Sequence, residues 1–164
     1  KRGLKAPFVV KVGDHHAGLG KARVEHDDEW PGLADLLVVA DDYVASEPWI
    51  AHRRDIRCLV LGDRMWAMAR ESRGWRANVD TCKHTLLDAS GFAAWTRAAQ
   101  RHLQADIVGL DFLETREGQY TSLECNDAPG LSGFPEEARQ WVVDLALQRL
   151  KNPPYQQGTV VDVG

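Results

Sequence analysis

The sequence predicts an α+β fold in which antiparallel hairpins are flanked by amphipathic helices. Apolar and polar residues alternate on both sides of a short turn at residues 54–71 and again at 109–127. Hydrophobic residues recur at helical spacing at 90–104 and 135–150. Alternation with period two is typical of strands, and recurrence every three or four residues is typical of helices. Together the two hairpins and two helices predict a mixed fold with mainly antiparallel sheets.

The first fifty residues are expected to form strands around a loop and one helix. Three segments read as strands or extended chain: 7–12, 22–26 and 43–50. A glycine-bearing stretch, GDHHAGLGK, separates the first two, so they fit a hairpin with a long tip. Residues 28–40 fit a helix with Pro31 in the first turn and with Trp30, Leu33, Leu36, Leu37 and Ala40 on one face. A strand over residues 36–40 is the competing interpretation.

The remaining elements follow from their turns and caps. Gly62-Asp63 lies at the turn of the 54–71 hairpin. The 90–104 helix has Ser90 as its candidate N-cap, and its inward residues are predicted to be Phe92, Trp95, Ala99 and Leu103 or their neighbours. Pro135 opens the last helix and Arg149 closes it, as the helix dipole favours. The tail after residue 150 is expected to be an extended arm.

The composition of the chain argues against several classes of protein, namely general nucleic-acid binders, membrane-spanning proteins and secreted proteins. The chain has 164 residues, which fits one domain or two small lobes, and its net charge of −4 does not indicate a general nucleic-acid surface. No apolar run reaches the length of a membrane-spanning helix, and no signal peptide is visible. Three scattered cysteines without CxxC spacing predict reduced thiols in a cytoplasmic protein, with Cys58 and Cys125 as core residues.

The hairpin GLDFLETREGQYTSLECND, residues 109–127, raises a charge problem. If Glu117 and Gly118 form a two-residue loop, residues whose numbers sum to 235 face each other, so Asp111 lies opposite Glu124 on a solvated face. At ~5 Å and an effective dielectric near 20, two carboxylates repel by roughly 3 kcal/mol. A divalent cation would offset this cost, and Asn126 adds a neutral oxygen, as Mg²⁺ prefers. The alternative is that the acids splay apart or pair with arginine.

A lysine strand and a glycine loop form a second candidate site. Lys11 interrupts an apolar strand, where an unpaired charge is costly, and the following loop ends in Lys21. Glycines let backbone N–H groups approach phosphate oxygens. The loop lacks the GxxxxGK[ST] spacing of a Walker A motif, and a plain hairpin tip is the alternative. His15 and His16 are weak metal candidates.

Arginines form a third set. Positions summing to 125 oppose each other in the 54–71 hairpin, so Asp55 faces Arg70, and Arg57 lies on the same side. Arg76 and Asn78, in GWRAN, extend this set. The excess of positive charge fits recognition of phosphate or carboxylate, although each arginine alone is more often a surface residue.

These motifs, taken in order, resemble the ATP-grasp superfamily, and specifically the branch that holds synapsins and ribosomal-protein glutamate ligases. Four stretches of the sequence carry this resemblance: VVKVGDHHAGLGK, EPWIAHRRDIRCLVLGD, ARESRGWRAN and DFLETREGQYTSLECNDAPGLSG. The resemblance runs from about residue 7 to residue 150. It implies an ATP-grasp fold with two lobes: residues 1–50 as part of the small lobe and 51–164 as the large lobe.

The resemblance also implies roles for particular residues. ATP would be bound by Lys11, Gly18, Gly20, Lys21, Glu47, Trp49, Ile50 and Asn78, with Pro48 beside them in the adenine pocket. Arg57, Arg70 and Arg76 would act in catalysis by facing the transferred phosphate or acyl phosphate. Asp111, Glu124 and Asn126 would hold Mg²⁺, with Mn²⁺ as the alternative ion.

The implied activity is ligation of a carboxylate to an amine, on an amino acid or peptide, through an acyl phosphate. Family members usually have a preceding α/β domain and an earlier phosphate-binding lysine, and this sequence contains neither. Two alternatives therefore stay open: a synapsin-like ATP-binding regulatory module with little turnover, and an ATP-grasp kinase. The expected partners are small-molecule or peptide substrates, without nucleic acid or membrane. Whether the protein forms a homo-oligomer and whether a further N-terminal domain precedes it are both left open by the sequence.

Overall fold

A computed structural model describes residues 4–13, 19–40, 42–72, 74–76 and 82–152. Its elements, in chain order, are β1 Phe8–Val12, β2 Lys21–Val24, a 3₁₀ turn Asp27–Glu29, α1 Trp30–Val38, β3 Val44–Pro48, β4 Arg54–Leu61, β5 Arg64–Glu71, β6 Lys83–Leu87, a 3₁₀ turn Ala89–Phe92, α2 Ala93–Leu103, β7 Ile107–Glu114, β8 Tyr120–Asn126 and α3 Glu136–Lys151. The predicted α+β mixture of hairpins and helices is confirmed.

The chain divides into two compact units. The first unit contains residues 1–56, 69–85 and 112–122, and the second contains residues 57–68, 86–111 and 123–164. Five strands, in the order β6-β5-β4-β7-β8, form one sheet, and β2-β1-β3 form another. Among the residues described, no helix has both the length and the apolar character that crossing a membrane requires.

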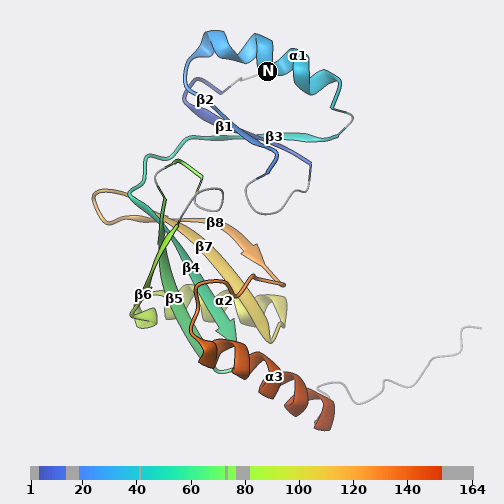
Figure 1. Ribbon diagram of the computed structural model, residues 1–164, viewed down its shortest axis with the longest axis vertical. Coiled ribbons are helices and arrows are strands. Elements are labelled where there is room, and N and C mark those ends of the chain that lie inside the picture. The colour runs from blue at the N-terminus through green and yellow to red at the C-terminus, as the bar shows by residue number, and fades with distance from the viewer. Residues whose placement is uncertain (1–3, 14–18, 41, 73, 77–81, 153–164) are drawn as a thin grey trace, which may run out of the picture. The chain divides into compact units, whose positions relative to one another are not determined.

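The three-stranded sheet belongs to the first unit and has one apolar face. β1 runs antiparallel to both β2 and β3. Phe8, Val10 and Val24 are buried together, and Leu33 and Leu37 of α1 pack against them. In Figure 1, α1 lies along this side of the sheet. The helical interpretation of this segment is therefore confirmed over residues 30–38, and the competing strand is wrong.

The inward face of α1 differs from the prediction at two positions, because Ala40 is exposed and lies beyond the end of the helix at Val38. Leu36 is 68% exposed, although it was assigned to the packed face. Trp30, Leu33 and Leu37 reach the sheet: the Trp30 ring packs edge-on against Phe8 with centroids 5.6 Å apart, and Leu33 and Leu37 contact the buried cluster.

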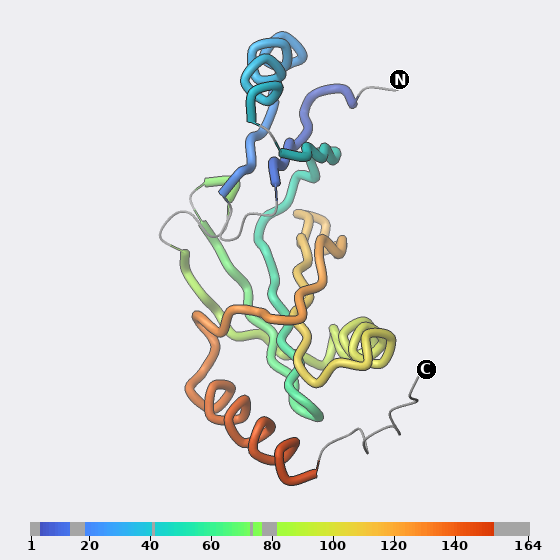
Figure 2. Tube along the Cα trace, turned by 90° about the vertical axis from the view of Figure 1, so that its right-hand side faces the viewer, coloured from blue at the N-terminus to red at the C-terminus, as the bar shows by residue number. Residues whose placement is uncertain are grey.

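In the second unit, α3 covers one face of the strands. Leu59 and Leu61 of β4 are fully buried, and they cluster with Ala138 and Leu145 of α3 and with Phe134 ahead of it. Figure 2 shows α2 and α3 on opposite sides of these strands. Arg57 lies two residues before Leu59, so its side chain projects from the same face of β4 as the residues under α3.

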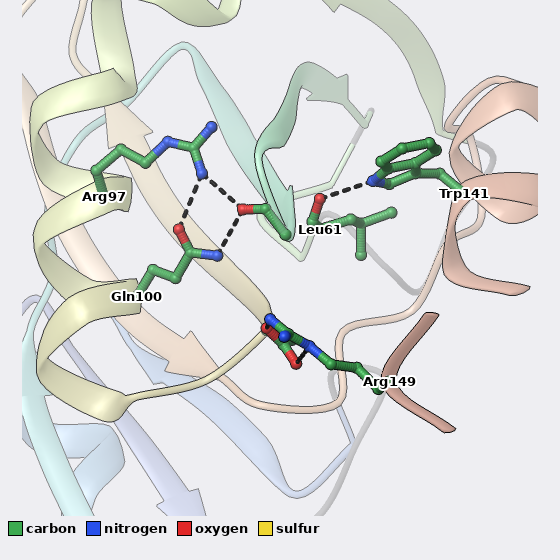
Figure 3. A network of polar contacts seen from close by, with 7 residues as sticks. Leu61, Arg97, Gln100, Trp141 and Arg149 are labelled. Carbon is green, nitrogen blue, oxygen red and sulfur yellow. Dashed lines mark hydrogen bonds and ion pairs between the residues drawn. The ribbon is translucent and has the colours of Figure 1, made fainter. Parts of the chain in front are cut away.

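A polar network fastens the turn between β4 and β5 to both helices (Figure 3). Arg97 Nη1 and Gln100 Nε2 of α2 donate to the carbonyl oxygen of Gly62, each at 2.7 Å. From α3, Trp141 Nε1 donates to the Leu61 carbonyl at 2.9 Å. Gly62 has a φ of 61°, which suits glycine at the predicted turn. These hydrogen bonds tie the turn to both α2 and α3.

The start and inward face of the 90–104 helix are corrected by the structure. Asp88, not Ser90, caps the first turn, because its carboxylate accepts from the Ser90 N–H at 3.0 Å. Hydrogen bonds from Ser90 lower the pKa of Asp88. Phe92 is buried as predicted, and Thr96, the neighbour of Trp95, is fully buried. Trp95 and Leu103 themselves are 48% and 51% exposed, so at these two positions the packed face is shifted from the predicted one.

Candidate functional site

The second face of the three-stranded sheet is polar. Lys11 lies directly opposite Lys21 in the β1–β2 pair, and Glu47 lies opposite Val9 in the β1–β3 pair. Side chains two apart share a face, so both lysines and Glu47 project to the same side. Lys11 Nζ donates to Glu47 Oε2 at 2.8 Å. The structure therefore brings these three predicted site residues together.

The same contact corrects the expectation for Lys11. Its side chain is 29% exposed and paired, rather than buried in an apolar strand. Two opposed lysines next to one glutamate leave an excess of positive charge on this face. Such a face suits a phosphorylated ligand.

The segment after β3 is held by backbone and ring contacts. Trp49 N–H donates to the Pro7 carbonyl at 3.1 Å, and His52 Nδ1 lies 2.8 Å from the Ile50 carbonyl oxygen. The Trp49 ring lies under the guanidinium of Arg23, 4.7 Å from its centroid. The contacts fix the orientation of Trp49 and of the Ile50 peptide group.

A hollow of about 460 Å³ opens beside this segment, within the first unit. We call it the arginine hollow; its walls include Arg23, Trp49, Arg53, Arg54, Arg70 and Trp75. Asp55 also lines it, so the predicted grouping of Asp55 with Arg70 holds in the structure. Arg70 is only 5% exposed. The hollow presents guanidinium groups and indole rings to one space, which suits a planar or anionic group.

Sequence reasoning missed several residues of this hollow. Arg53 and Arg54 precede the recognised DIR stretch, and nothing in their spacing showed that they line the same space as Arg23. The available signal was the run of two arginines where the segment after β3 enters β4. Arg76 is half-buried, with its guanidinium 5.4 Å from the Trp75 ring centroid.

In the second unit, Arg57 of β4 forms an ion pair with Asp111 of β7 through two hydrogen bonds. Arg57 Nε donates to Asp111 Oδ1 at 2.8 Å, and Arg57 Nη2 donates to Oδ2 at 2.6 Å. The two side chains are 15% and 5% exposed. The prediction that Asp111 lies on a solvated face is therefore wrong, and pairing with arginine, the alternative, is observed for this acid.

The reason for this burial is the segment that follows β8. A Cβ on Gly109 would lie 2.5 Å from Pro129 Cβ, and a Cβ on Gly130 would lie 3.9 Å from Arg57 Nη1. The chain after the hairpin thus folds back over the face that carries the ion pair. The absence of a side chain at Gly109 permits the close approach of Pro129.

Glu124 and Asn126 project together from β8. Asn126 Nδ2 donates to Glu124 Oε1 at 3.2 Å, and the Glu124 side chain is exposed. A Cβ on Gly109 would lie 3.8 Å from Asn126 Cβ, which agrees with the predicted pairing of these two positions. β8 adjoins β7, the strand of Asp111.

The turn of this hairpin differs from the prediction. Thr115 N–H donates to the Gln119 carbonyl at 2.9 Å, so the loop contains three residues, 116–118, rather than two. Gly118 has a φ of 78°, as a three-residue turn with a left-handed last position requires. The turn pair sums to 234 and the Gly109–Asn126 pair to 235, so the strands shift by one residue between these points.

The donor set fits a hard cation by its chemistry. Two carboxylates and an amide supply oxygen atoms, which Mg²⁺ and Mn²⁺ prefer. Arg57 donates to both carboxylate oxygens of Asp111, which places a positive charge beside this donor set. Among the described residues, no group of three or more His, Cys, Asp or Glu gathers as a metal site. Asn126 would thus complete the donor set of Asp111 and Glu124.

The cysteines do not form a reactive site. Burial, and then the Asp111 carboxylate, raise the pKa of Cys58 to about 12. Burial also raises the pKa of Cys125, although its side chain is exposed, so the prediction that Cys125 fills the core is wrong. The three cysteines form no disulfide.

Some predicted residues lie outside the described part of the chain. They are Gly18 of the glycine loop, Asn78, both adjacent histidines His15 and His16, and the tail from residue 153. Gly20 is described and has a φ of 66°, directly before Lys21.

Two sheets with few flanking helices fit the ATP-grasp class of protein that the sequence predicts. The chain belongs to the family of synapsin ATP-binding domains, whose model, "Synapsin, ATP binding domain", matches residues 3–152. The resemblance drawn from the sequence is thereby confirmed.

The chain is also similar to bacterial ligases. It is 30% identical over 154 residues to the "Ribosomal protein bS6--L-glutamate ligase" of Escherichia fergusonii, covering 89% of this chain and 50% of that protein. It is 30% identical over 156 residues to the "Probable alpha-L-glutamate ligase" of Mannheimia succiniciproducens, covering 90% and 50%. The chain therefore spans about half the length of these curated relatives.

A solved structure supports the fold alone. The macrocyclase MdnC, bound with precursor peptide MdnA from Microcystis aeruginosa MRC, superposes with a TM-score of 0.66 at 14% identity. The match covers 87% of this chain and 48% of that chain.

Proposed function

We propose that this domain binds ATP and Mg²⁺ and belongs to a ligase that joins a carboxylate to an amine through an acyl phosphate. The observation that carries the proposal is the β7–β8 hairpin, where the buried Arg57–Asp111 pair adjoins the strand of Glu124 and Asn126. Phosphoryl transfer needs fixed positive charge and oxygen ligands for a cation at one place. The similarity to the two glutamate ligases supports this reaction class.

The nucleotide would be bound by the first unit. Lys11 and Lys21 share a sheet face on which positive charge exceeds negative, which favours the phosphates, with Gly18, Gly20 and Asn78 as further ligands. Glu47, Trp49 and Ile50 lie at the end of β3 and directly after it, and they would line the base. These assignments, and lobes at 1–50 and 51–164, are our proposal.

The reaction has two steps. A carboxylate oxygen of the substrate attacks the γ-phosphorus of ATP, the bond to the β–γ bridging oxygen breaks, and ADP leaves. The amine nitrogen then attacks the acyl carbon, phosphate leaves with the carbon–oxygen electron pair, and the amine loses a proton. Arg57, Arg70 and Arg76 would hold the negative charge that develops on the transferred group. Mg²⁺ at Asp111, Glu124 and Asn126 would neutralise phosphate charge when bound.

The substrate classes are a carboxylate and an amine on an amino acid or peptide. The glutamate ligases named above support glutamate as one of them. A cytoplasmic location fits the three thiols without a disulfide. The net charge of −4 gives no reason to propose a nucleic-acid partner.

Hydroxylamine trapping tests the proposal. The protein is incubated with ATP, Mg²⁺, hydroxylamine and either glutamate or glutamate-containing peptides, while ADP and hydroxamate are measured. The proposal predicts both products with the natural chain, their loss in Glu124→Gln, and their retention in Glu117→Gln, which removes an exposed acid from the same hairpin. ADP without hydroxamate would indicate a kinase instead. Tight ATP binding with neither product would indicate a regulatory module.

A further inference from the structure

A buried carboxylate outside the predicted site, Glu114, holds two consecutive arginines. Glu114 ends β7 and is 3% exposed. Its Oε1 accepts from Arg53 Nη2 at 2.6 Å, and its Oε2 accepts from Arg54 Nε at 2.5 Å. Its backbone carbonyl also accepts from the Arg53 N–H at 2.8 Å. Glu114 is therefore bonded through main chain and side chain to one short segment.

We call this set of contacts between Glu114, Arg53 and Arg54 the Glu114 clamp, and its geometry is unusual for a strand. Consecutive side chains in a strand point to opposite faces, so two neighbouring arginines do not ordinarily reach one carboxylate. Arg54 is the first residue of β4, and Arg53 precedes it. The clamp thus fixes the chain direction where the segment from Trp49 enters the sheet. A buried acid held by charged hydrogen bonds tolerates little movement of its partners.

The segment held by the clamp is the one that the proposed function assigns to the base. Trp49 and Ile50 lie four and three residues before Arg53. At its other end, the segment is tied by the Trp49 N–H to the Pro7 carbonyl, and internally by His52 to the Ile50 carbonyl. Glu114 supplies the anchor on the side of β7. Arg53 and Arg54 also line the arginine hollow together with Trp49.

We propose that Glu114 is a positioning residue for nucleotide binding: it holds Arg53 and Arg54 and thereby sets the backbone of residues 49–52 for the base. The inference rests on the proposed function. Glu114 acts through the segment and does not contact the nucleotide. Its loss therefore weakens binding of the base, and it weakens nucleotides with and without a triphosphate by the same factor.

The test compares ATP with AMP. Dissociation constants for both are measured by calorimetry on Glu114→Gln, which keeps the side-chain size and removes the charge. We expect both constants to rise about tenfold, which corresponds to about 1.4 kcal/mol of binding free energy. Asp106→Asn is the control, because Asp106 also accepts from a guanidinium, that of Arg149, but belongs to the second unit. It should leave both constants unchanged.

Arg54→Gln provides a second variant that keeps Glu114. It should weaken the binding of ATP and of AMP by the same factor. This variant keeps the inference testable if Glu114→Gln is too unstable to measure. Unchanged constants in a folded Glu114→Gln or Arg54→Gln protein would overturn the inference while leaving the proposed function intact. A loss confined to ATP would overturn it too, since it would assign the effect to the phosphates. If the natural chain binds neither nucleotide, the proposed function fails, and this inference fails with it.

Discussion

Replacing Arg57 by methionine measures what the buried ion pair contributes to the second unit. Methionine keeps an unbranched apolar side chain and removes the guanidinium, so Asp111 loses the two N–H donors at 2.8 and 2.6 Å. Two unit charges ~4 Å apart attract by about 4 kcal/mol at an effective dielectric near 20. Removing one partner of a buried pair costs about 3–5 kcal/mol. Because Arg57 is 15% exposed, we expect the lower end, about 3 kcal/mol.

Urea unfolding followed by tryptophan fluorescence gives the free energy of unfolding directly. A loss of about 3 kcal/mol also lowers the Tm by roughly 6–12 °C for a chain of this size. Arg139→Met is the control, because Arg139 pairs with Glu136 at the surface, with side chains 51% and 80% exposed. It should cost less than about 0.5 kcal/mol. If Arg57→Met costs no more than the control, the ion pair does not hold Asp111 as described.

Three further predictions concern packing and thiol chemistry. Gly109→Ala should lose about 1–3 kcal/mol, because its Cβ would lie 2.5 Å from Pro129 Cβ, whereas Gly91→Ala meets nothing within 4 Å; equal costs would contradict the close packing. Cys58, whose pKa is raised to about 12, should resist a disulfide reagent at about pH 8 until the protein unfolds, and rapid labelling of the native protein would contradict its burial. Since the unfolded thiol, with a pKa of 9.0, loses its proton first, this group should make unfolding easier as pH rises from 9.0 towards 12.

The hairpins and helices were predictable because each is encoded by local periodicity. The turn at Gly62 and the helix from Glu136 appear where the sequence predicts them. The three-residue loop before Gln119 could not be predicted from the sequence, since Glu117-Gly118 fits a two-residue turn equally well by composition. A shift of one residue in a hairpin follows directly from that ambiguity.

The burial of Asp111 lay beyond the reach of periodicity. An alternating strand predicts one solvated face, but the chain after β8 returns to cover that face at Pro129. The contacts of Glu114 with Arg53 and Arg54 join residues about sixty positions apart, and no local pattern encodes such a pair. The candidate site residues could therefore be predicted from their residue types and their order in the chain. Their interaction partners became evident only from the structure.

The account depends most on Glu124 acting with Asp111 and Asn126 as the cation site of a nucleotide-binding domain. Its direct test is the dissociation constant of ATP with Mg²⁺ and with a chelator, in the natural chain and in Glu124→Gln, with Glu117→Gln as control. We predict that Glu124→Gln weakens Mg-ATP by tenfold or more, about 1.4 kcal/mol, and leaves metal-free ATP nearly unchanged. An equal loss for both forms of ATP would contradict the cation site.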